Sequence, residues 1–362
     1  MLKIRRFTCE NMAEGCVTDN CTPSFAFSVD SDRQGAYIKK AVISVGDWSV
    51  TTVEQTGVPY GGMELKPFGT YTAKLKVWDD ADETAEAELT FETGRMSEPW
   101  HAEWITDGEY HFTEKKVSPV PMTFRKKFNL DKNVKSARVY ATAIGIYELA
   151  LNGSKVGDEF FAPGFTSYKS RLQYQTYDVT KALRENNELL VTVAGGWAVG
   201  SFIYTRKNRI TADRQALLLE VRIQYEDGTI QIIKTDSDWD VTMRGSYRAA
   251  DFYDGETYDA TVRLNDIDYH KAVIEKVNIH PIISAACGAP VRAHEKMLPV
   301  SCNLTKEGFV YDFGQNFAGV VQLKLKGKRG QKVTVHHAEI LKPDGTLNTA
   351  FLRTAKATAQ YI

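Results

Sequence analysis

The densest cluster of acidic side chains in the sequence lies in the run DFYDGETYD. Asp251, Asp254, Glu256 and Asp259 surround a turn-forming pair, Asp254 and Gly255. Closely spaced carboxylates suit Ca²⁺, and two of them can act as general acid and general base. The D-x-D-x-D-G order of a calcium loop is missing, however, and no His or Lys stands beside the acids. We favour a turn whose carboxylates cap backbone amides or bridge to another domain, with calcium on Asp251, Asp254 and Glu256 as the functional alternative.

An indole flanked by glycines is the second candidate site. Trp197 follows Gly195 and Gly196 at the end of the apolar run 189–193, and Gly200 comes soon after. Glycines around a Trp at a strand end can leave the indole exposed as a stacking surface for a sugar ring. A Trp at this place fills a core somewhat more often. Trp197 and Gly196 are therefore candidate carbohydrate-binding residues, with core packing as the alternative.

The spacing of the histidines and cysteines disfavours a metal site. His336 and His337 lie in a strand-like pattern, and adjacent strand residues point to opposite faces, so the two cannot bind one ion together. The gaps between Cys9, Cys16 and Cys21 miss the C-x2-C pattern of a zinc site, and no fourth ligand is near.

The run VYDFGQNFAGV, residues 310–320, places one acid and two amides between valines. It is either an active-site strand or a structural strand that carries polar groups. The sequence contains no G-x-S-x-G elbow, phosphate-binding loop or dinucleotide fingerprint. Spacing alone therefore identifies no catalytic centre in this chain.

The composition limits the classes of partner. A length of 362 residues predicts two or three domains, and the net charge of −1 disfavours nucleic acid and anionic membranes as partners. No apolar run is long enough to span a bilayer, and the first ten residues do not resemble a secretory signal. Five cysteines, an odd number, fit a reducing cytoplasm better than a disulfide framework.

Period-two alternation dominates the chain and predicts an all-β fold. In 217–225 the odd-numbered residues are apolar and most even-numbered ones polar, which predicts a half-buried strand. The run 138–151 is a second long strand pattern, interrupted at Gly145. Only 178–185 could form a short helix. Asn-Gly or Asp-Gly pairs predict tight turns at 152–153, 227–228 and 344–345.

Two breaks in the pattern, at 93–99 and 279–290, divide the chain into three predicted units. Gly, Ser and Pro follow the first strand-like region, and the second break is apolar for a linker, so we expect it to lie across a neighbouring domain. The predicted units are 1–95, 100–280 and 290–362. Strands every eight to twelve residues favour sandwiches in each unit.

Eight stretches occur in order along the second and third units, and others in the first. They are 100–105, 140–148, 151–158, 161–168, 174–180, 255–260, 310–316 and 337–341. This series resembles the non-catalytic, β-rich N-terminal half of bacterial α-L-rhamnosidases, glycoside hydrolase family 78. The stretches 23–27, 34–37, 75–79 and 91–94 resemble the family's fibronectin-III-like entry domain. Phe165 stands where the family commonly has Trp, and Ala359 where its closing strand usually has Asp.

The resemblance implies tandem β-sandwiches and no catalytic residue in this chain. It implies a fibronectin-III/Ig-like domain in 1–95, a jelly-roll-like domain in 100–280, and in 290–362 a partial β-sandwich ahead of an (α/α)6 barrel. Family members release terminal L-rhamnose with inversion, which needs two carboxylates roughly 6.5–9.5 Å apart. The family holds these in the barrel, so we expect this bacterial, cytoplasmic chain to be inactive alone and to have an unpaired edge in its last sandwich. Its partners would be its own catalytic domain and rhamnose-containing glycans.

The resemblance also favours a structural role for 310–320. Asp312, Gln315 and Asn316 are then expected to satisfy backbone groups at a bend. In some members the module matching 100–280 resembles a calcium-dependent rhamnose-binding domain, although its ligands cannot be matched residue by residue here. No cofactor is expected apart from that possible calcium. The alternatives are a stand-alone carbohydrate-binding or adhesin-like protein and a scaffold without a ligand.

Overall fold

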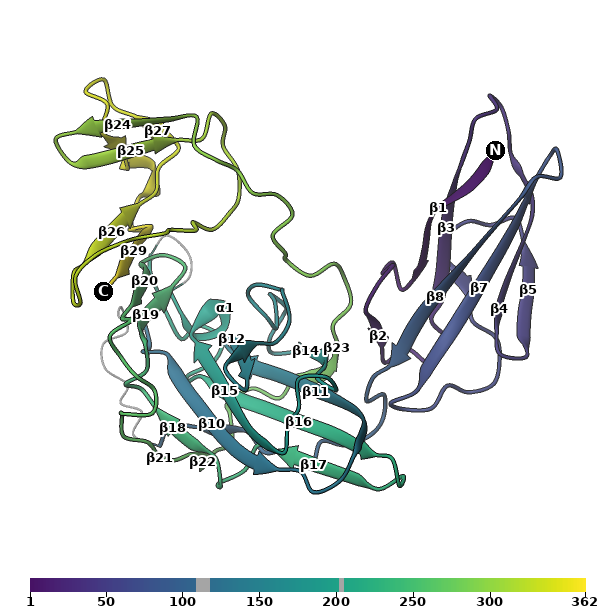
Figure 1. Ribbon diagram of the computed structural model, residues 1–362, viewed down its shortest axis with the longest axis horizontal. Coiled ribbons are helices and arrows are strands. Elements are labelled where there is room, and N and C mark those ends of the chain that lie inside the picture. Colours follow the sequence, from purple (N-terminus) through teal and green to yellow (C-terminus); the bar gives the residue numbers. More distant parts are fainter. Residues whose placement is uncertain (109–117, 202–204) are drawn as a thin grey trace. The chain divides into compact units, whose positions relative to one another are not determined.

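The computed structural model describes residues 1–108, 118–201 and 205–362, and these form an almost entirely β-stranded protein (Figure 1). They divide into two compact units. Unit 1 comprises Met1–Trp100, Gln173–Thr176 and Ile282–Pro290, and unit 2 comprises His101–Leu172, Tyr177–Pro281 and Val291–Ile362. The predicted all-β fold is confirmed, and the division into three domains stays a prediction. Within the three described ranges, no helix is long and apolar enough to cross a membrane.

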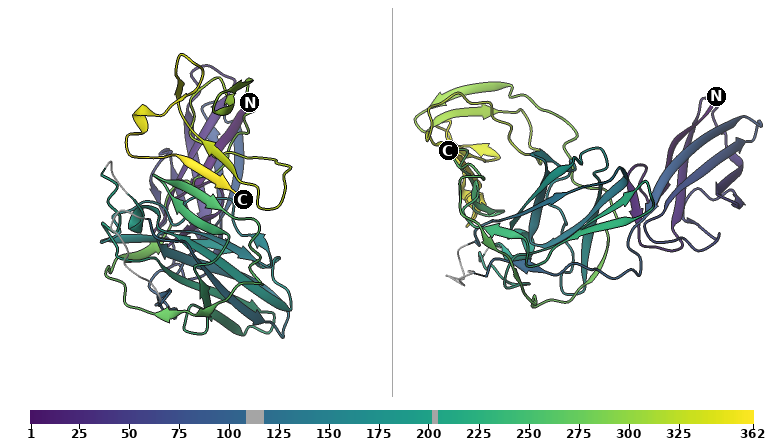
Figure 2. Two further views of the ribbon diagram at one scale, coloured as in Figure 1. Left: turned by 90° about the vertical axis from the view of Figure 1, so that its left-hand side faces the viewer. Right: turned by 60° about the horizontal axis from the view of Figure 1, so that its bottom comes forward.

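Unit 1 is a sandwich of two sheets (Figures 1 and 2). The smaller sheet has the order β1 (Leu2–Cys9), β3 (Ser24–Ser31), β6 (Val58–Pro59). The larger has the order β2 (Cys16–Thr18), β8 (Thr84–Thr93), β7 (Thr70–Asp79), β4 (Ile38–Val45), β5 (Trp48–Thr52). Apolar residues alternate along these strands and meet in one core, where Phe25 of β3 contacts Phe91 of β8 with ring centroids 5.8 Å apart.

Two larger sheets form most of unit 2. One has the order β13 (Ser154–Lys155), β12 (Ile146–Leu151), β15 (Asn186–Ala194), β10 (Met122–Asn129), β18 (Asp240–Thr242), β21 (His270–Lys271). The other has the order β22 (Val273–Ile274), β9 (Ile105–Thr106), β16 (Ala216–Tyr225), β11 (Val134–Ile144), with β17 (Ile230–Lys234) paired to β16. β14 (Arg171–Asp178) lies partly, and β23 (Ile282–Ala285) wholly, in the segments assigned to unit 1. One apolar cluster contains side chains from both sheets, which is the packing of a β-sandwich.

Strand β16 lies where the alternation predicted it, but it is more deeply buried than a half-buried strand. Its odd-numbered side chains are in the core, as expected. Glu220, expected on a solvent face, is also buried, with 2% of its surface exposed. Its carboxylate accepts hydrogen bonds from the backbone N–H groups of His101 and Ala102, the latter at 2.9 Å. These donors satisfy the charge, so the acid can be buried on the second face.

The interruption predicted at Gly145 is confirmed, and it separates two strands that belong to different sheets. Strand β11 ends at Ile144 and β12 begins at Ile146. Gly145 has a φ of +132°, and a Cβ there would lie 2.2 Å from the carbonyl oxygen of Ala194. Only glycine fits this conformation and this close approach, so the chain can turn from one sheet into the other.

The three predicted turns are confirmed, but the helix predicted in 178–185 is wrong. Gly153 and Gly228 adopt φ values of +81° and +82° in hairpins, and Gly345, at +80°, lies in the turn between β27 (Ile340–Leu341) and β28 (Leu347–Asn348). The supposed helix is one turn, in which the amides of residues 182 and 183 bond to the Val179 carbonyl. The Asp178 carboxylate caps that turn at the Thr180 amide, 2.9 Å away.

The end of unit 2 contains three small sheets and little core. A four-stranded sheet has the order β19 (Tyr247–Asp251), β20 (Gly255–Tyr258), β29 (Thr358–Tyr361), β26 (Val333–His336), and β20 and β29 run parallel. β24 (Ser301–Thr305) pairs with β25 (Gly308–Asp312), and β27 with β28. Among the described residues, the helical elements are α1 (Gly196–Val199) and a 3-10 turn, Ala350–Leu352.

The strand predicted for 310–320 is shorter than expected. β25 ends at Asp312, whose carboxylate accepts a hydrogen bond from the Gly314 amide at 2.8 Å. This local bond caps a bend and ends the strand. Gln315 lies beyond the bend, with its side-chain amide 3.7 Å from the Met297 sulfur.

Candidate functional site

Trp197 is positioned by a tight backbone path at the end of β15. Gly195 and Gly196 lead from that strand into the short helix α1. Gly196 has a φ of +51°, and a Cβ there would lie 2.7 Å from the side chain of Ile146. It is buried, so it serves the backbone turn and offers no surface to a ligand.

The Trp197 indole belongs to a group of four rings, Phe161, Phe165, Trp197 and Phe252, which we call the aromatic cluster. Trp197 stacks on Phe252 with centroids 4.4 Å apart and ring planes at 28°. Phe161 and Phe165 meet the indole edge-on at 6.0 and 5.8 Å. Trp197 is half-buried, whereas Phe165 is 61% exposed. The open ring of the cluster is therefore Phe165, and Trp197 supports it from beneath.

Asp251 anchors the turn that carries Phe252. One carboxylate oxygen accepts hydrogen bonds from the amides of Tyr253 and Asp254, at 2.8 and 3.1 Å. The other accepts from the Ser201 amide at 2.8 Å and from the Ser118 hydroxyl. Asp251 is 9% exposed, and these donors satisfy its charge. Its role in this structure is to hold the turn against the segment that follows α1.

Asp254 and Glu256 point to different partners. The Asp254 carboxylate lies 2.5 Å from Nη2 of Arg206 and 3.4 Å from Nζ of Lys356. Glu256 lies on β20, where Tyr361 donates a hydrogen bond to it. Burial, and then the negative charge of Glu148, raise the pKa of Glu256.

The three candidate calcium ligands thus do not meet in the structure. Across residues 1–108, 118–201 and 205–362, no three His, Cys, Asp or Glu side chains are grouped so as to hold a metal ion. His336 bonds through Nδ1 to the Thr358 hydroxyl at 3.0 Å, and burial lowers the pKa of His337. Calcium binding stays a prediction, and it would require Asp251 or Asp254 to exchange its present partners for the ion.

The structure brings together two candidates that were separate in the sequence. Trp197 and the acidic turn 251–254 meet through the stacking of Trp197 on Phe252. The cluster therefore links one exposed ring, Phe165, to the turn that carries the Arg206–Asp254 ion pair. An exposed ring can stack on the apolar face of a sugar, and charged groups can bond its hydroxyls. Sequence reasoning missed Phe161, Phe252 and Arg206. Of these, only Phe252 had a local signal, as an aromatic residue inside the acidic run.

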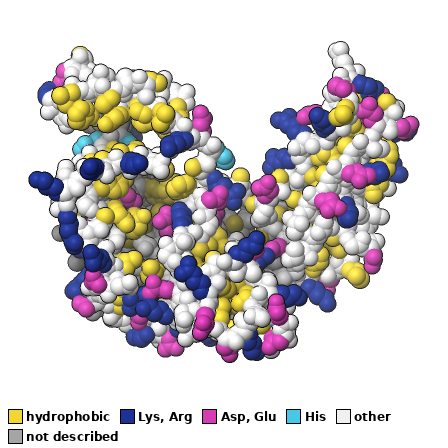
Figure 3. All heavy atoms as spheres, in the orientation of Figure 1, with side chains coloured by type: hydrophobic (Ala, Val, Ile, Leu, Met, Phe, Trp, Pro, Cys, Tyr) yellow, Lys and Arg dark blue, Asp and Glu magenta, His cyan; other side chains and the backbone are white. Residues whose placement is uncertain are grey.

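A second surface feature is the exposed apolar face of the β24–β25 hairpin. Leu304 pairs with Phe309 and Cys302 with Tyr311, so these four side chains share one face of the hairpin. Leu304 is 74% exposed, Phe309 67% and Tyr311 56%. Figure 3 shows hydrophobic side chains gathered over this part of the chain. Such a face is typical of a surface that another protein element covers.

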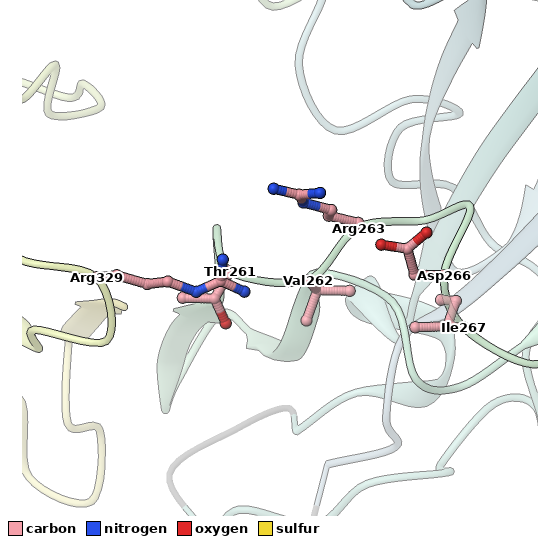
Figure 4. A pocket seen from close by; sticks show the side chains of 6 residues that line it. All are labelled: Thr261, Val262, Arg263, Asp266, Ile267 and Arg329. Carbon is pink, nitrogen blue, oxygen red and sulfur yellow. The ribbon is translucent and has the colours of Figure 1, made fainter.

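A shallow hollow elsewhere in unit 2 contains none of the candidate residues. It is lined by Thr261, Val262, Arg263, Asp266, Ile267 and Arg329 (Figure 4). The two arginines approach it from different segments, and Asp266 adds an opposite charge.

Comparison with known families accounts for most of the chain. Residues 4–97 match the Rha78A-like N-terminal immunoglobulin domain, 132–300 the α-L-rhamnosidase N-terminal domain, and 303–362 the bacterial α-L-rhamnosidase concanavalin-like domain. The chain belongs to the α-L-rhamnosidase family. Its matches are to the domains found in the N-terminal part of these proteins, as the sequence motifs predicted.

Relatives of this chain are much longer than it is. An α-L-rhamnosidase of Streptomyces avermitilis is 38% identical over 270 residues, which cover 68% of this chain and 25% of that protein. One of Formosa agariphila is 31% identical over 307 residues, covering 80% of this chain and 33% of the relative. The chain thus spans about a quarter to a third of these relatives.

Solved rhamnosidase structures share the fold of nearly the whole chain. The α-L-rhamnosidase from Dictyoglumus thermophilum superposes with a TM-score of 0.85 at 29% identity, over 99% of this chain and 44% of its own. That from Aspergillus terreus gives 0.88 at 28% identity, over 100% of this chain and 44% of its own.

Proposed function

We propose that this chain is the non-catalytic, N-terminal β-domain region of an enzyme that hydrolyses terminal α-L-rhamnose from glycosides with inversion. In this proposal the region supports and orients a C-terminal (α/α)6 catalytic domain. The family membership and the fraction of each relative that the chain covers support it. The acids of the candidate site are held by backbone amides, Arg206 and Lys356, which suits structural carboxylates better than a catalytic pair.

The observation that carries the supporting role is the uncovered apolar face of β24–β25. The apolar side chains of Leu304, Phe309 and Tyr311 are exposed to water. Burying them under a packed neighbour would stabilise the protein by roughly 25 cal/mol per Å² of apolar surface. The catalytic domain, or the strands that connect it to this chain, is the occupant that the family suggests. Covering this face would fix the orientation of the two parts.

Limited proteolysis tests this role. We expect the chain alone to be cut readily within 313–332, where few residues are buried or in strands. In a longer protein in which the chain is followed by a catalytic domain, these cuts should be suppressed. Equal cutting in both proteins would show that nothing docks on this part of the chain and would contradict the proposal.

A second function, carbohydrate binding by the chain itself, is favoured by the aromatic cluster. Phe165 offers an exposed ring, and the turn that carries Phe252 also carries the Arg206–Asp254 ion pair. Calorimetric titration with L-rhamnose, with and without calcium, tests this function and the predicted calcium dependence together. Heat that saturates at millimolar sugar would support a binding module; no heat in either buffer would leave only the supporting role.

A further inference from the structure

Two buried cysteines lie in the core of the unit 1 sandwich. Cys9 ends β1 in the smaller sheet, and Cys16 begins β2 in the larger one. Their exposed fractions are 0% and 2%. Both cysteines belong to the same core cluster. The side chain of Cys16, and then burial, raise the pKa of the Cys9 thiol. The other cysteines, Cys21, Cys287 and Cys302, are exposed.

The strand register brings the two cysteines to the same part of the core. Cys9 lies opposite Phe25 in the β1–β3 pair, and Cys16 lies opposite Phe91 in the β2–β8 pair. Those two rings contact each other across the core, so the cysteine beside each ring is brought to the same place. Reciprocal hydrogen bonds between Cys9 and Met12, at 3.0 and 2.9 Å, close the loop that leads from one sheet to the other.

We propose that Cys9 and Cys16 are an inter-sheet redox pair, which forms a disulfide when the chain folds in the presence of a low-molecular-weight disulfide such as glutathione disulfide. One protein thiolate attacks the oxidant, which forms a mixed disulfide and releases one glutathione thiolate. The second protein thiolate attacks the protein sulfur of that mixed disulfide and releases the second glutathione. Two protein thiols are oxidised, one glutathione disulfide is reduced, and the two thiol protons pass to the released thiolates.

Burial determines when the two thiols can react with the oxidant. The thiolate is the nucleophile in this exchange, and a buried thiol with a raised pKa forms little of it. The folded, reduced pair is therefore protected, and oxidation belongs to folding, before the core closes. The covalent state of the pair then records the redox conditions under which the chain folded, independently of any role in rhamnose hydrolysis.

A thiol count on the refolded chain tests the pair. The full chain carrying Cys21→Ser, Cys287→Ser and Cys302→Ser keeps only Cys9 and Cys16. It is unfolded with reductant and refolded either in a glutathione redox buffer or in dithiothreitol. We expect no free thiol after the glutathione refolding and two after dithiothreitol, with a peptide map showing the Cys9–Cys16 link. Two free thiols, or glutathione adducts on either cysteine, after glutathione refolding would overturn the proposal.

Two controls separate the pair from its surroundings. The same variant folded in dithiothreitol and then transferred to glutathione buffer should keep both thiols for far longer than the folding chain does; rapid loss would contradict protection by burial. The further change Cys16→Ala should leave Cys9 as a free thiol or a glutathione adduct. Should that variant fail to fold, the melting temperature decides instead: the oxidised form must melt higher than the reduced one and lose the difference on reduction.

Discussion

The indole of Trp197 stacks on the ring of Phe252, with centroids 4.4 Å apart, and thereby joins the glycine-flanked strand end to the acidic turn. Phe165 extends this cluster toward solvent. If the cluster binds sugar, Phe165→Ala should weaken L-rhamnose binding about 2- to 10-fold, the usual worth of one aromatic contact. Phe165→Trp, with a larger ring, should restore or exceed the original affinity. Calorimetry on both variants measures this, and equal affinities would place the sugar elsewhere.

Asp251 should matter more for stability than its neighbour in the same acidic run. Asp251→Ala leaves the buried Ser201 amide without its acceptor and should lower the free energy of unfolding by about 1.5–3 kcal/mol. Asp259 bonds only locally to Thr261, at 2.9 Å to its amide, so Asp259→Ala is the matched control with a smaller loss. Urea unfolding of both variants gives the comparison. A larger loss from Asp259→Ala would contradict the anchoring role of Asp251.

The raised pKa of Glu256 predicts a dependence of stability on pH. Below the ordinary glutamate pKa of 4.5 the acid is protonated whether the chain is folded or not. As the pH rises from there through the raised pKa, the unfolded chain releases the proton first, so the free energy of unfolding falls. Glu256→Gln should remove this fall and keep an acceptor for Tyr361. Urea midpoints from about pH 4 to about pH 8 measure it.

Glu148 provides the control for that pH dependence. Its charge contributes to the raised pKa of Glu256, so Glu148→Gln should make the fall in stability shallower without abolishing it. Parallel curves for the original chain and Glu256→Gln would show that Glu256 is not the titrating group.

The exposed hairpin face should govern association of the isolated chain. Leu304→Lys and Phe309→Lys together should reduce concentration-dependent association, because they replace two exposed apolar side chains by charges. Ser301→Lys with Asn303→Lys, on the opposite face of the hairpin, adds the same two charges and is the charge-matched control. Light scattering after size exclusion checks the mass of each variant. If this control pair has the same effect, net charge rather than the apolar face is responsible.

Much of the fold could be predicted because its signals are local. The alternation of residues 217–225 and the glycine at 145 each determine the local backbone conformation. Both β16 and the break before β12 therefore lie where expected. The turn at 178–185 was mistaken for a helix because a capping Asp followed by helix-forming residues is the sequence pattern of both a helix start and a single capped turn. Glu220 was mistaken for a surface residue because its two backbone donors come from residues more than a hundred positions away.

The candidate site could be predicted only in pieces. The flanking glycines identified Trp197 and the neighbouring acids identified Asp251. Only the folded chain shows that Phe252 stacks on Trp197 and that Arg206 forms an ion pair with Asp254. Phe165 differs from the Trp that is common in the family at this position. Because its ring is exposed, the difference changes the size of a solvent-facing aromatic surface. Long-range stacking and ion pairs leave no local pattern.

The release of L-rhamnose from an aryl rhamnoside by this purified chain tests the central claim most directly. We expect no release above the buffer rate from the chain alone, and release from a longer protein in which the chain is followed by a catalytic domain. Turnover by the chain alone, retained through repeated purification and lost on unfolding, would place a catalytic carboxylate pair within these β-sandwiches and would contradict the account.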